Sequence, residues 1–181
     1  MYQIHGYRES LMDPRFRKYH HTIDLPRLKE EAEKLLWEPD HNRFRTQMSL
    51  QTNGQADWDS GTGSRIGEAE DQCDKLHPDL LGTWWEDFFK NLPFKVYRSR
   101  LMTMHPRTCY SIHVDDNPRL HVAIKTHRQA RFIFTNPPNL KHIPEDGHIW
   151  WVDTRQEHSA MNGSMEDRIH LVMCLVNTDK D

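Results

Sequence analysis

The feature that most constrains the fold is a succession of short apolar segments that begins near residue 94 and continues almost to the C-terminus. Each segment is rich in β-branched and aromatic residues, and Pro, Asn, Asp or Gly separates it from the next. The segments are FKVYRSRLMTMHP, TCYSIHVD, RLHVAIKTH, RQARFIFTN, HIWWVDTRQ, EHSAMN and RIHLVMCLV. Short strands at this spacing predict an all-β sandwich or barrel.

The residues that precede this region have a different pattern, which predicts helices. In residues 24–39 apolar side chains recur on one helical face, Asp24 is a candidate N-cap, and a proline suits the first turn. Residues 78–92 have a broad apolar face and predict a second helix. Residues 43–51 alternate between polar and apolar side chains and therefore predict a strand.

A polar, Gly-rich segment, residues 53–67, predicts a long loop between these elements. Such a loop is either a surface excursion or a lid over a binding site, and as a lid it would bring Trp58 against a bound substrate. No linker separates the two halves of the chain. We therefore expect one domain over residues 1–181, with a helical part at about 1–93 packed on a β-roll at about 94–177.

Charge and cysteine usage limit the kind of protein this is. The net charge of −3 gives no general attraction to nucleic acid or to an anionic membrane. No apolar run approaches the roughly 20 residues of a membrane span, and charges interrupt the N-terminal segment, unlike a signal peptide. The three cysteines are scattered without a CxxC motif, which argues against a disulfide framework, and Cys109 and Cys174 are expected in the core. We expect a cytoplasmic protein, and the sequence does not indicate its oligomeric state.

The segment SIHVDDNPRLH, residues 111–121, concentrates residue types that bind metals and anions. In a strand, residues i and i+2 point to the same face, so His113 and Asp115 are expected to project together. Arg119 and His121 share a face of the next strand, whose opposite face is apolar. Because burying a charged face without partners is costly, we expect it to line a cavity.

A second cluster follows in EHSAMNGSMEDRIHLV. Its Asn-Gly pair is a strong turn signal, and His158 and Arg168 lie five residues on either side of Gly163. A hairpin closed at this turn would make His158 and Arg168 near neighbours across the ladder.

Together, His113, Asp115 and the remote His158 match the two-histidine, one-carboxylate facial triad of non-haem Fe(II) oxygenases. Such a triad leaves metal positions open for an anionic cosubstrate and for O₂. Arg168 has a planar, two-pronged donor set that suits the far carboxylate of that cosubstrate.

An HxD pair, a distant His and an Arg ten residues later, on a predicted β-roll, resemble the 2-oxoglutarate-dependent oxygenases. More narrowly, RLHVAI followed by WWVDTRQEHSAMNGSMEDRIHLV resembles the aspartyl/asparaginyl β-hydroxylase branch, over roughly residues 96–176. The resemblance implies a double-stranded β-helix, that is, a cupin-like jelly-roll, with Fe(II) and 2-oxoglutarate as cofactors. By matching position, Arg119 and His121 help to bind the cosubstrate and Arg168 is its main carboxylate clamp.

The same resemblance implies a hydroxylase that acts on an amino acid or peptide-like substrate and releases succinate and CO₂. One departure from the branch is relevant to the substrate. The aspartyl hydroxylase that gives the branch its name lacks the carboxylate ligand, whereas this chain has Asp115. The chain therefore resembles more closely the relatives that hydroxylate free amino acids, which argues against a protein domain as the substrate.

Other interpretations of these residues remain open at this point. His113 and Asp115 also fit an exposed polar strand face, and His121 also fits a metal ligand with Asp115 supporting it. Arg128 and Arg131 are alternative partners for a substrate carboxylate. The alternative function is a non-catalytic, cupin-like protein that binds a metal or a small ligand on the same roll.

Overall fold

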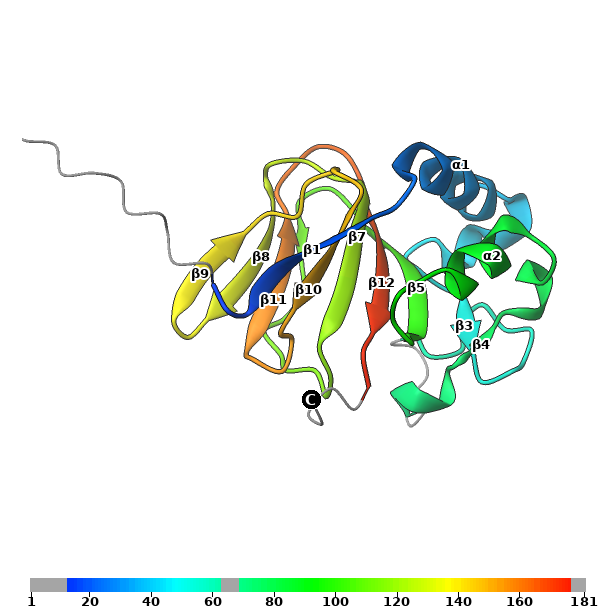
Figure 1. Cartoon of the computed structure of the whole chain (residues 1–181). Helices are drawn as coiled ribbons and strands as arrows, with labels where there is room; N and C mark the ends of the chain where they lie inside the picture. The colour runs from blue at the N-terminus through cyan, green and yellow to red at the C-terminus, as the bar shows by residue number, and fades with distance from the viewer. Residues whose placement is uncertain (1–12, 63–68, 177–181) are drawn as a thin grey trace, which may run out of the picture.

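In the computed structural model, which describes residues 13–62 and 69–176, most strands form two main antiparallel sheets packed face to face (Figure 1), and Gln51–Thr52 and Lys75–Leu76 form a separate two-stranded sheet. The larger sheet has the strand order β1-β10-β7-β12-β5-β2, and the smaller one has the order β6-β11-β8-β9. A cluster of apolar side chains from both sheets, including Phe16, Ala123, Phe134 and Ala160, fills the space between them. The arrangement confirms the predicted mainly β jelly-roll.

The bounds of the elements are as follows. The strands are β1 Phe16–Thr22, β2 Gln47–Ser49, β3 Gln51–Thr52, β4 Lys75–Leu76, β5 Tyr97–Met104, β6 Thr108–Cys109, β7 Arg119–Lys125, β8 Ala130–Thr135, β9 Pro138–Lys141, β10 His148–Val152, β11 His158–Asn162 and β12 Arg168–Cys174. The α-helices are α1 Leu25–Leu36 and α2 Trp84–Lys90, and 3₁₀ helices span Pro39–Phe44, Glu70–Gln72 and Pro78–Leu80. Among the described residues, no helix is both long and apolar enough to cross a membrane.

Helix α1 forms where the sequence predicts it. The Asp24 side chain accepts a hydrogen bond from the backbone N–H of Arg27 at 3.1 Å, which satisfies one of the free N–H groups of the first turn. The face that carries Leu28, Ala32 and Leu36 is buried against the outer face of the larger sheet. Together with α2, this helix covers that face of the sheet (Figure 1).

The second predicted helix is interrupted. Residues 78–80 form a 3₁₀ turn, and the chain then turns at Gly82, whose φ is +73°, a conformation that favours glycine. Helix α2 begins only at Trp84, where Thr83 caps it by accepting a hydrogen bond from the N–H of Trp85. Leu81, within the range predicted as one helix, is exposed because it lies in the interruption.

The N-terminal part is less helical than predicted, because it also contains strands. β1 was not predicted; it pairs with β10 and forms one edge of the larger sheet, with most of its side chains exposed. β2 pairs with β5 at the opposite edge, and it starts at Gln47 because residues 39–44 form a 3₁₀ helix. The division near residue 93 is therefore not a boundary of the sheet. Whether the chain is one domain stays a prediction.

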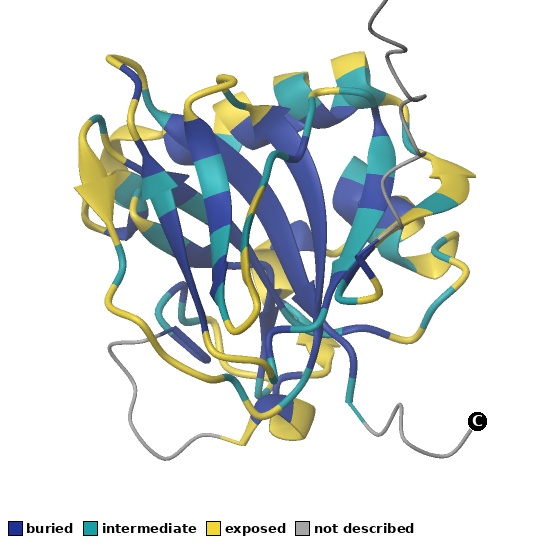
Figure 2. Ribbon diagram, turned by 90° about the vertical axis from the view of Figure 1, so that its left-hand side faces the viewer, coloured by how far each residue is buried: buried dark blue, intermediate teal, exposed yellow. Residues whose placement is uncertain are grey.

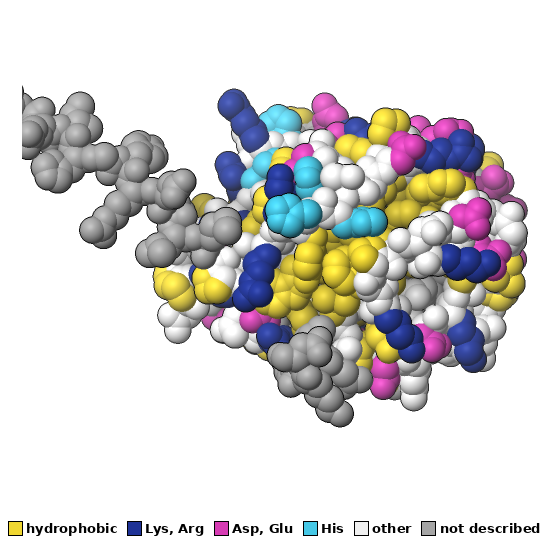
Figure 3. All heavy atoms as spheres, viewed as in Figure 1, with side chains coloured by type: hydrophobic (Ala, Val, Ile, Leu, Met, Phe, Trp, Pro, Cys, Tyr) yellow, Lys and Arg dark blue, Asp and Glu magenta, His cyan; other side chains and the backbone are white. Residues whose placement is uncertain are grey.

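The histidines of the chain are partly surface residues. His20 and His21 of β1 are exposed. On the face of the molecule drawn in Figure 3, histidine side chains lie beside apolar surface. The total of thirteen histidines is therefore no measure of metal binding. Of the cysteines, Cys174 is buried as expected, but Cys109 is exposed because β6 lies at the edge of the smaller sheet.

The central strands β7 and β12 are buried on both faces (Figure 2). On β7, Leu120, Val122 and Ile124 face the helices, as predicted. Arg119 and His121, on alternate positions, face the space between the sheets. A strand with a buried polar face is stable only if that face finds partners or ligands, so this face locates the site.

The predicted hairpin between His158 and Arg168 is wrong. β11 pairs with β8 and β6 in the smaller sheet, whereas β12 lies between β7 and β5 in the larger one. The chain crosses from one sheet to the other after Asn162, whose side-chain amide donates to the carbonyls of Met104 and Glu166. These hydrogen bonds hold a crossover rather than a tight turn. His158 and Arg168 consequently enter the space between the sheets from opposite sides.

The predicted contact between Trp58 and a substrate is also wrong. Trp58 belongs to the core between the larger sheet and the helices, where its ring stacks on His77 at a centroid distance of 3.6 Å. It is not among the residues that line the cavity between the sheets. Residues 63–67 of the expected loop lie outside the described residues, so its role as a lid stays a prediction.

Candidate active site

A cavity of about 300 Å³ lies between the two sheets. Its lining combines carbon-rich side chains with an unusual number of charged and imidazole groups. The polar and charged lining residues are Gln47, Arg98, Arg100, Tyr110, Ser111, His113, Asp115, Arg119, His121, Thr154, His158 and Arg168. All six residues predicted for the site are in this set.

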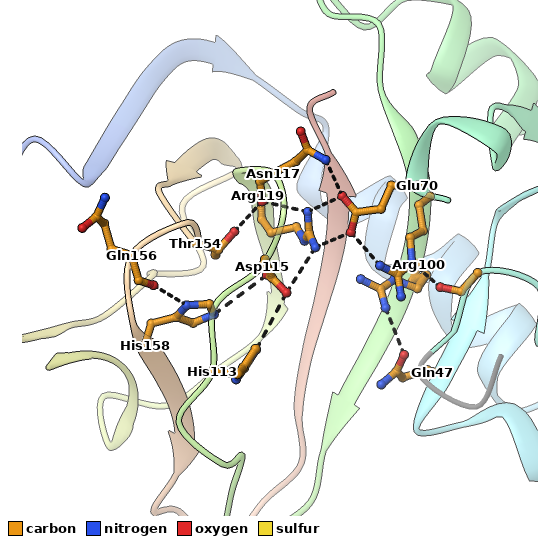
Figure 4. Close-up of polar contacts among 12 residues, drawn as sticks. Gln47, Glu70, Arg100, His113, Asp115, Asn117, Arg119, Thr154, Gln156 and His158 are labelled. Carbon is orange, nitrogen blue, oxygen red and sulfur yellow. Dashed lines mark hydrogen bonds and ion pairs between the residues drawn. The ribbon is translucent and has the colours of Figure 1, made fainter. Parts of the chain in front are cut away.

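Three of these residues form a cluster with the geometry of a metal site. One potential ligand atom from each of His113, Asp115 and His158 lies within 4.8 Å of the other two. Oδ1 of Asp115 lies 3.9 Å from Nε2 of His113, and Oδ2 of Asp115 lies 3.9 Å from Nε2 of His158 (Figure 4). No other group of three such ligands occurs in the described part of the chain, and His121 is not a member of this one.

The backbone brings these ligands together without a regular strand at residues 111–115. His113 and His158 form an isolated β-bridge, in which the N–H of each donates to the carbonyl of the other at 2.9 Å. The N–H of Asp115 donates to the carbonyl of Thr154 at 2.9 Å. Of the predicted strand at residues 108–115, only β6 and this bridge form, yet His113 and Asp115 still project together.

The hydrogen bonds of the two imidazoles fix which nitrogen is available. Nδ1 of His113 lies 2.8 Å from the carbonyl of Ser111, and Nδ1 of His158 lies 2.8 Å from the carbonyl of Gln156. A carbonyl only accepts, so each Nδ1 carries the proton and each Nε2 has a free lone pair toward Asp115. Burial lowers the pKa of His158 and favours its neutral form, which is the form that binds metal.

A buried carboxylate that the sequence prediction missed, Glu70, holds one side of the cavity. It accepts hydrogen bonds from Arg119, from Arg98 at 2.6 Å and from Asn117 at 2.9 Å. Burial by itself would raise the pKa of Glu70, but Arg119 and the other donors outweigh it and lower the pKa. Nη2 of Arg119 also lies 3.3 Å from Asp115 (Figure 4). Glu70 therefore orients the arginine that in turn orients Asp115.

Arg98 reaches Glu70 from an irregular position in β5. The register between β5 and β12 shifts at this point, and Arg98 has a φ of +46°. A β-bulge of this kind redirects a side chain, and a positive φ is uncommon for a residue other than glycine. The bulge brings the guanidinium of Arg98 to the carboxylate of Glu70.

Two other arginines of the cavity are buried without a carboxylate partner among the described residues. Nη2 of Arg168 contacts Nδ1 of His170 at 2.9 Å, and Nη1 of Arg100 donates to the Gln47 side chain at 3.0 Å. Burial lowers the pKa of each guanidinium to about 10, so both remain charged near neutral pH. The cavity therefore has two cationic groups that are not neutralised in the described part of the chain.

His121 and His170 complete the inner face of the larger sheet as neutral groups. Burial lowers the pKa of each well below its usual range, and the neighbouring Arg168 lowers it further. Neither nitrogen of His121 has a hydrogen-bond partner in the structure as far as it is described, and its ring lies edge-on to Phe132. An imidazole with two unused nitrogens in a cavity is available to a ligand.

The remaining candidates are outside the cavity. Arg128 is exposed on the loop before β8, and Arg131 is half-buried on the β8 face opposite Phe132. Neither lines the cavity. Arg98 and Arg100 do line it, and Glu70 contacts the lining residue Arg119. The alternation of Arg98 and Arg100 in YRSRLMTM was a usable signal of a polar cavity face. Glu70, in a three-residue 3₁₀ helix, had no such signal.

Comparisons with known proteins bear on the family and on the fold of the chain. Residues 23–178 match the family model described as aspartyl/asparaginyl β-hydroxylase. A 2OG-Fe(II) oxygenase family oxidoreductase from Burkholderia pseudomallei is 14% identical, with a TM-score of 0.50 over 83% of this chain and 76% of its own. The viral collagen prolyl hydroxylase of Paramecium bursaria Chlorella virus-1 is 10% identical, with a TM-score of 0.51 over 88% of this chain and 94% of its own. No curated protein sequence matches. At these identities the two structures show a common fold.

Proposed function

Since the chain belongs to the aspartyl/asparaginyl β-hydroxylase family, and is thus an enzyme of the hydroxylase type, we propose that it is an Fe(II)- and 2-oxoglutarate-dependent dioxygenase that hydroxylates an amino acid or peptide-like substrate. The other products of the proposed reaction are succinate and CO₂. The observation that supports this proposal most directly is the convergence of His113, Asp115 and His158 on one point of the cavity.

The donor set fits Fe(II) on chemical grounds. Two neutral imidazoles and one carboxylate are the ligands of the facial triad, which leaves a metal with open positions and net positive charge. The carbonyls of Ser111 and Gln156 orient the imidazoles, and Arg119 orients the carboxylate. Outer partners of this kind fix the direction of the ligands and adjust their basicity.

When bound, Fe(II) and 2-oxoglutarate supply the O₂ activation that hydroxylates an unactivated C–H bond. The protein's own contribution is to bind, orient and desolvate. Arg168 is proposed to bind the carboxylate of 2-oxoglutarate farthest from the metal, because it is buried in the cavity with no anionic partner among the described residues. His170 accepts a hydrogen bond from Arg168 and holds the guanidinium in place.

Arg119 and His121 are proposed to act near the metal-bound end of the cosubstrate. Arg119 contacts Asp115 directly, so it lies beside the proposed metal position, although Glu70 uses much of its hydrogen-bonding capacity. His121, neutral and without partners in the described residues, has a donor and an acceptor available. Phe132 stacks on the ring of His158 and gives the cavity an apolar lining beside it.

The partner implied by the cavity is a small molecule or a short peptide, because about 300 Å³ is the size of a small ligand site. The oligomeric state and the compartment do not follow from these residues. The cytoplasmic location suggested by the scattered cysteines stays a prediction.

The decisive experiment measures succinate formed from 2-oxoglutarate by purified protein, with Fe(II) added after removal of metals by a chelator. We expect Fe(II)-dependent succinate formation in the wild type and none above background in Asp115→Ala. Bound metal, measured by mass spectrometry, should fall with it. The control is Asp116→Ala, which removes an exposed neighbouring carboxylate and should behave as the wild type. Wild-type turnover in Asp115→Ala would show that the carboxylate is not a ligand.

A further inference from the structure

The second arginine without a carboxylate partner, Arg100, is not used by the proposed chemistry. It lies on β5, its exposed fraction is 6%, and it lines the cavity. One of its terminal nitrogens donates to the side-chain oxygen of Gln47 at 3.0 Å, and its Nε is buried without a hydrogen-bond partner in the described part of the chain. A buried guanidinium has five donors, and Arg100 uses few of them.

Leaving a cation in this state is unfavourable for the free protein. Burial removes hydration from the charge, and a neutral amide oxygen compensates for little of that loss. The neighbouring Arg98 and Arg119 are also cations, and they share Glu70 with each other rather than with Arg100. An anionic ligand that enters the cavity would supply the missing partner.

The register of the larger sheet separates Arg100 from the proposed cosubstrate clamp. Arg168 is paired with Met104, and Arg100 is paired with Val172, in the same β5–β12 ladder. The two arginines are therefore four residues apart along the ladder, which is about 13 Å at roughly 3.3 Å per residue. Arg168 lies at one end of the inner face. Arg100 lies in the row of Val172 and His121, on the side of the edge strand β2.

A single diacid therefore does not satisfy both arginines and the metal. If 2-oxoglutarate extends from the triad to Arg168, its two carboxylates are used at the metal and at Arg168. Arg100, displaced from this line toward the edge strand β2, then keeps unused donors for a carboxylate of the second substrate.

We propose that Arg100 is the residue that selects the substrate, and that its guanidinium binds a carboxylate of the molecule to be hydroxylated. The inference rests on the proposed function for the identity of the cavity's other occupants. The carboxylate comes either from the α-carboxylate of a free amino acid or from the side chain of an acidic residue in a peptide. Gln47 holds the guanidinium in place from β2.

The test is a binding measurement that does not depend on turnover. Wild type, Arg100→Met and Arg168→Met are loaded with Mn(II) and titrated by calorimetry, first with 2-oxoglutarate and then, in its presence, with three sets of probes. The sets are free L-amino acids, their α-amides, and peptides blocked at both ends that contain either Asp or Asn. Arg131→Met, outside the cavity, is the matched control.

We expect at least one carboxylate probe to bind the wild type, and Arg100→Met to weaken that binding by roughly tens to thousands of fold. The amide form of the same probe should bind the wild type about as weakly as the acid form binds Arg100→Met. The amide should lose little further affinity in Arg100→Met, as expected for coupled partners in a double-mutant cycle. Weaker binding of the α-amides than of the free amino acids identifies a free amino acid as the substrate. Weaker binding of the Asn peptide than of the Asp peptide identifies an acidic peptide. Arg168→Met should lower the affinity for 2-oxoglutarate more than Arg100→Met does.

A stability measurement separates this role from a structural one. If Arg100 served only the fold, Arg100→Met would lower the melting temperature; we expect it unchanged or raised, because an uncompensated buried charge is removed. Arg100→Lys, which keeps the charge but not the planar donor set, should bind the carboxylate with intermediate affinity. It also replaces the Met variant if that one does not fold.

Four results would overturn the proposal: no binding of any carboxylate probe to the wild type, equal binding of acid and amide, an Arg100→Met protein with wild-type affinity, or a larger loss of 2-oxoglutarate than in Arg168→Met. Failure of the proposed function is seen separately. A wild type that binds carboxylates through Arg100 but forms no succinate refutes only the oxygenase activity.

Discussion

The four arginines of the cavity divide into two pairs that the protein treats differently. Arg98 and Arg119 converge on the buried carboxylate of Glu70, and Arg119 reaches Asp115 as well. Arg100 and Arg168 have only neutral partners, Gln47 and His170, among the described residues. The first pair is neutralised within the fold, whereas the second pair remains available to anions that come from outside.

The difference indicates which arginines belong to the framework and which to ligands. A buried ion pair with several hydrogen bonds has a fixed geometry and is strongly destabilised when one partner is removed. A buried cation without an anion is already unfavourable, so its removal should affect binding more than stability. Two substitutions in the cavity test this division, and a third, at an ion pair outside the cavity, gives a comparison.

The largest effect is expected for Glu70→Gln. The substitution keeps the shape of the side chain but leaves the guanidinium groups of Arg98 and Arg119 without their carboxylate. Breaking a buried pair in this way costs about 3–5 kcal/mol of unfolding free energy. Metal affinity should also fall by roughly 10–100-fold, since Arg119 no longer orients Asp115. Urea denaturation with and without metal measures both effects.

The matched control for Glu70→Gln is Glu38→Gln, because Glu38 is exposed. The control should stay within about 0.5 kcal/mol of the wild type. A Glu70→Gln protein as stable as the control would remove the distinction between the two pairs.

A smaller and different effect is expected for Arg168→Met. It removes the proposed clamp for the far carboxylate of 2-oxoglutarate, which corresponds to about 2–5 kcal/mol of binding free energy. The apparent constant for 2-oxoglutarate should rise by roughly tens to thousands of fold, while the unfolding free energy is unchanged or higher. Initial rates of succinate formation against 2-oxoglutarate concentration measure the first quantity. Arg128→Met, at an exposed position, is the control. An equal rise of the apparent 2-oxoglutarate constant in this control would show that Arg168 is not the clamp.

The smallest effect concerns an ion pair outside the cavity, between Asp13 and Arg15. The hydrogen bond from the Arg15 side chain lowers the pKa of Asp13 to about 2, from an ordinary value of 3.8. Because the pKa of Asp13 is depressed in the folded state, the pair contributes fully to the free energy of unfolding above a pH of about 4. This contribution is lost as the pH falls toward about 2. The contribution is on the order of 2 kcal/mol.

Asp13→Asn should therefore be less stable than the wild type by about 2 kcal/mol near pH 6, and the two should converge near pH 2. Denaturation at a series of pH values measures the difference, and Asp116→Asn serves as the control because its carboxylate is exposed. A difference that persists at pH 2 would mean that Asp13 acts through packing or neutral hydrogen bonds.

Much of the fold and of the proposed site follows from local sequence patterns. The alternation in RLHVAI predicts which side of β7 is apolar, and His113 and Asp115 converge as their spacing predicts. The cap of α1 at Asp24 is a property of a few adjacent residues. These features depend on side-chain periodicity, which is present in the sequence itself.

The errors concern pairings between distant segments. A turn signal at Asn162-Gly163 does not reveal that the next strand joins the other sheet, because that choice depends on which strands remain unpaired elsewhere. Glu70 lies in a 3₁₀ helix of only three residues, which is too short to show a periodicity that would mark it as the partner of Arg119. β1 carries mostly exposed side chains and therefore lacks the apolar alternation by which strands are recognised.

The backbone bridge between His113 and His158 has a consequence for how the protein acquires its metal. Two reciprocal main-chain hydrogen bonds hold the imidazoles side by side, with ring centroids 4.4 Å apart, and no metal takes part in those bonds. In small metal-dependent domains the ligands are gathered only when the ion binds, so the binding free energy is also the folding free energy. Here the conformational entropy of gathering the ligands is lost during folding. Chelation should empty the site of such a protein without unfolding it, and the ion should enter a preorganised set of ligands on its return.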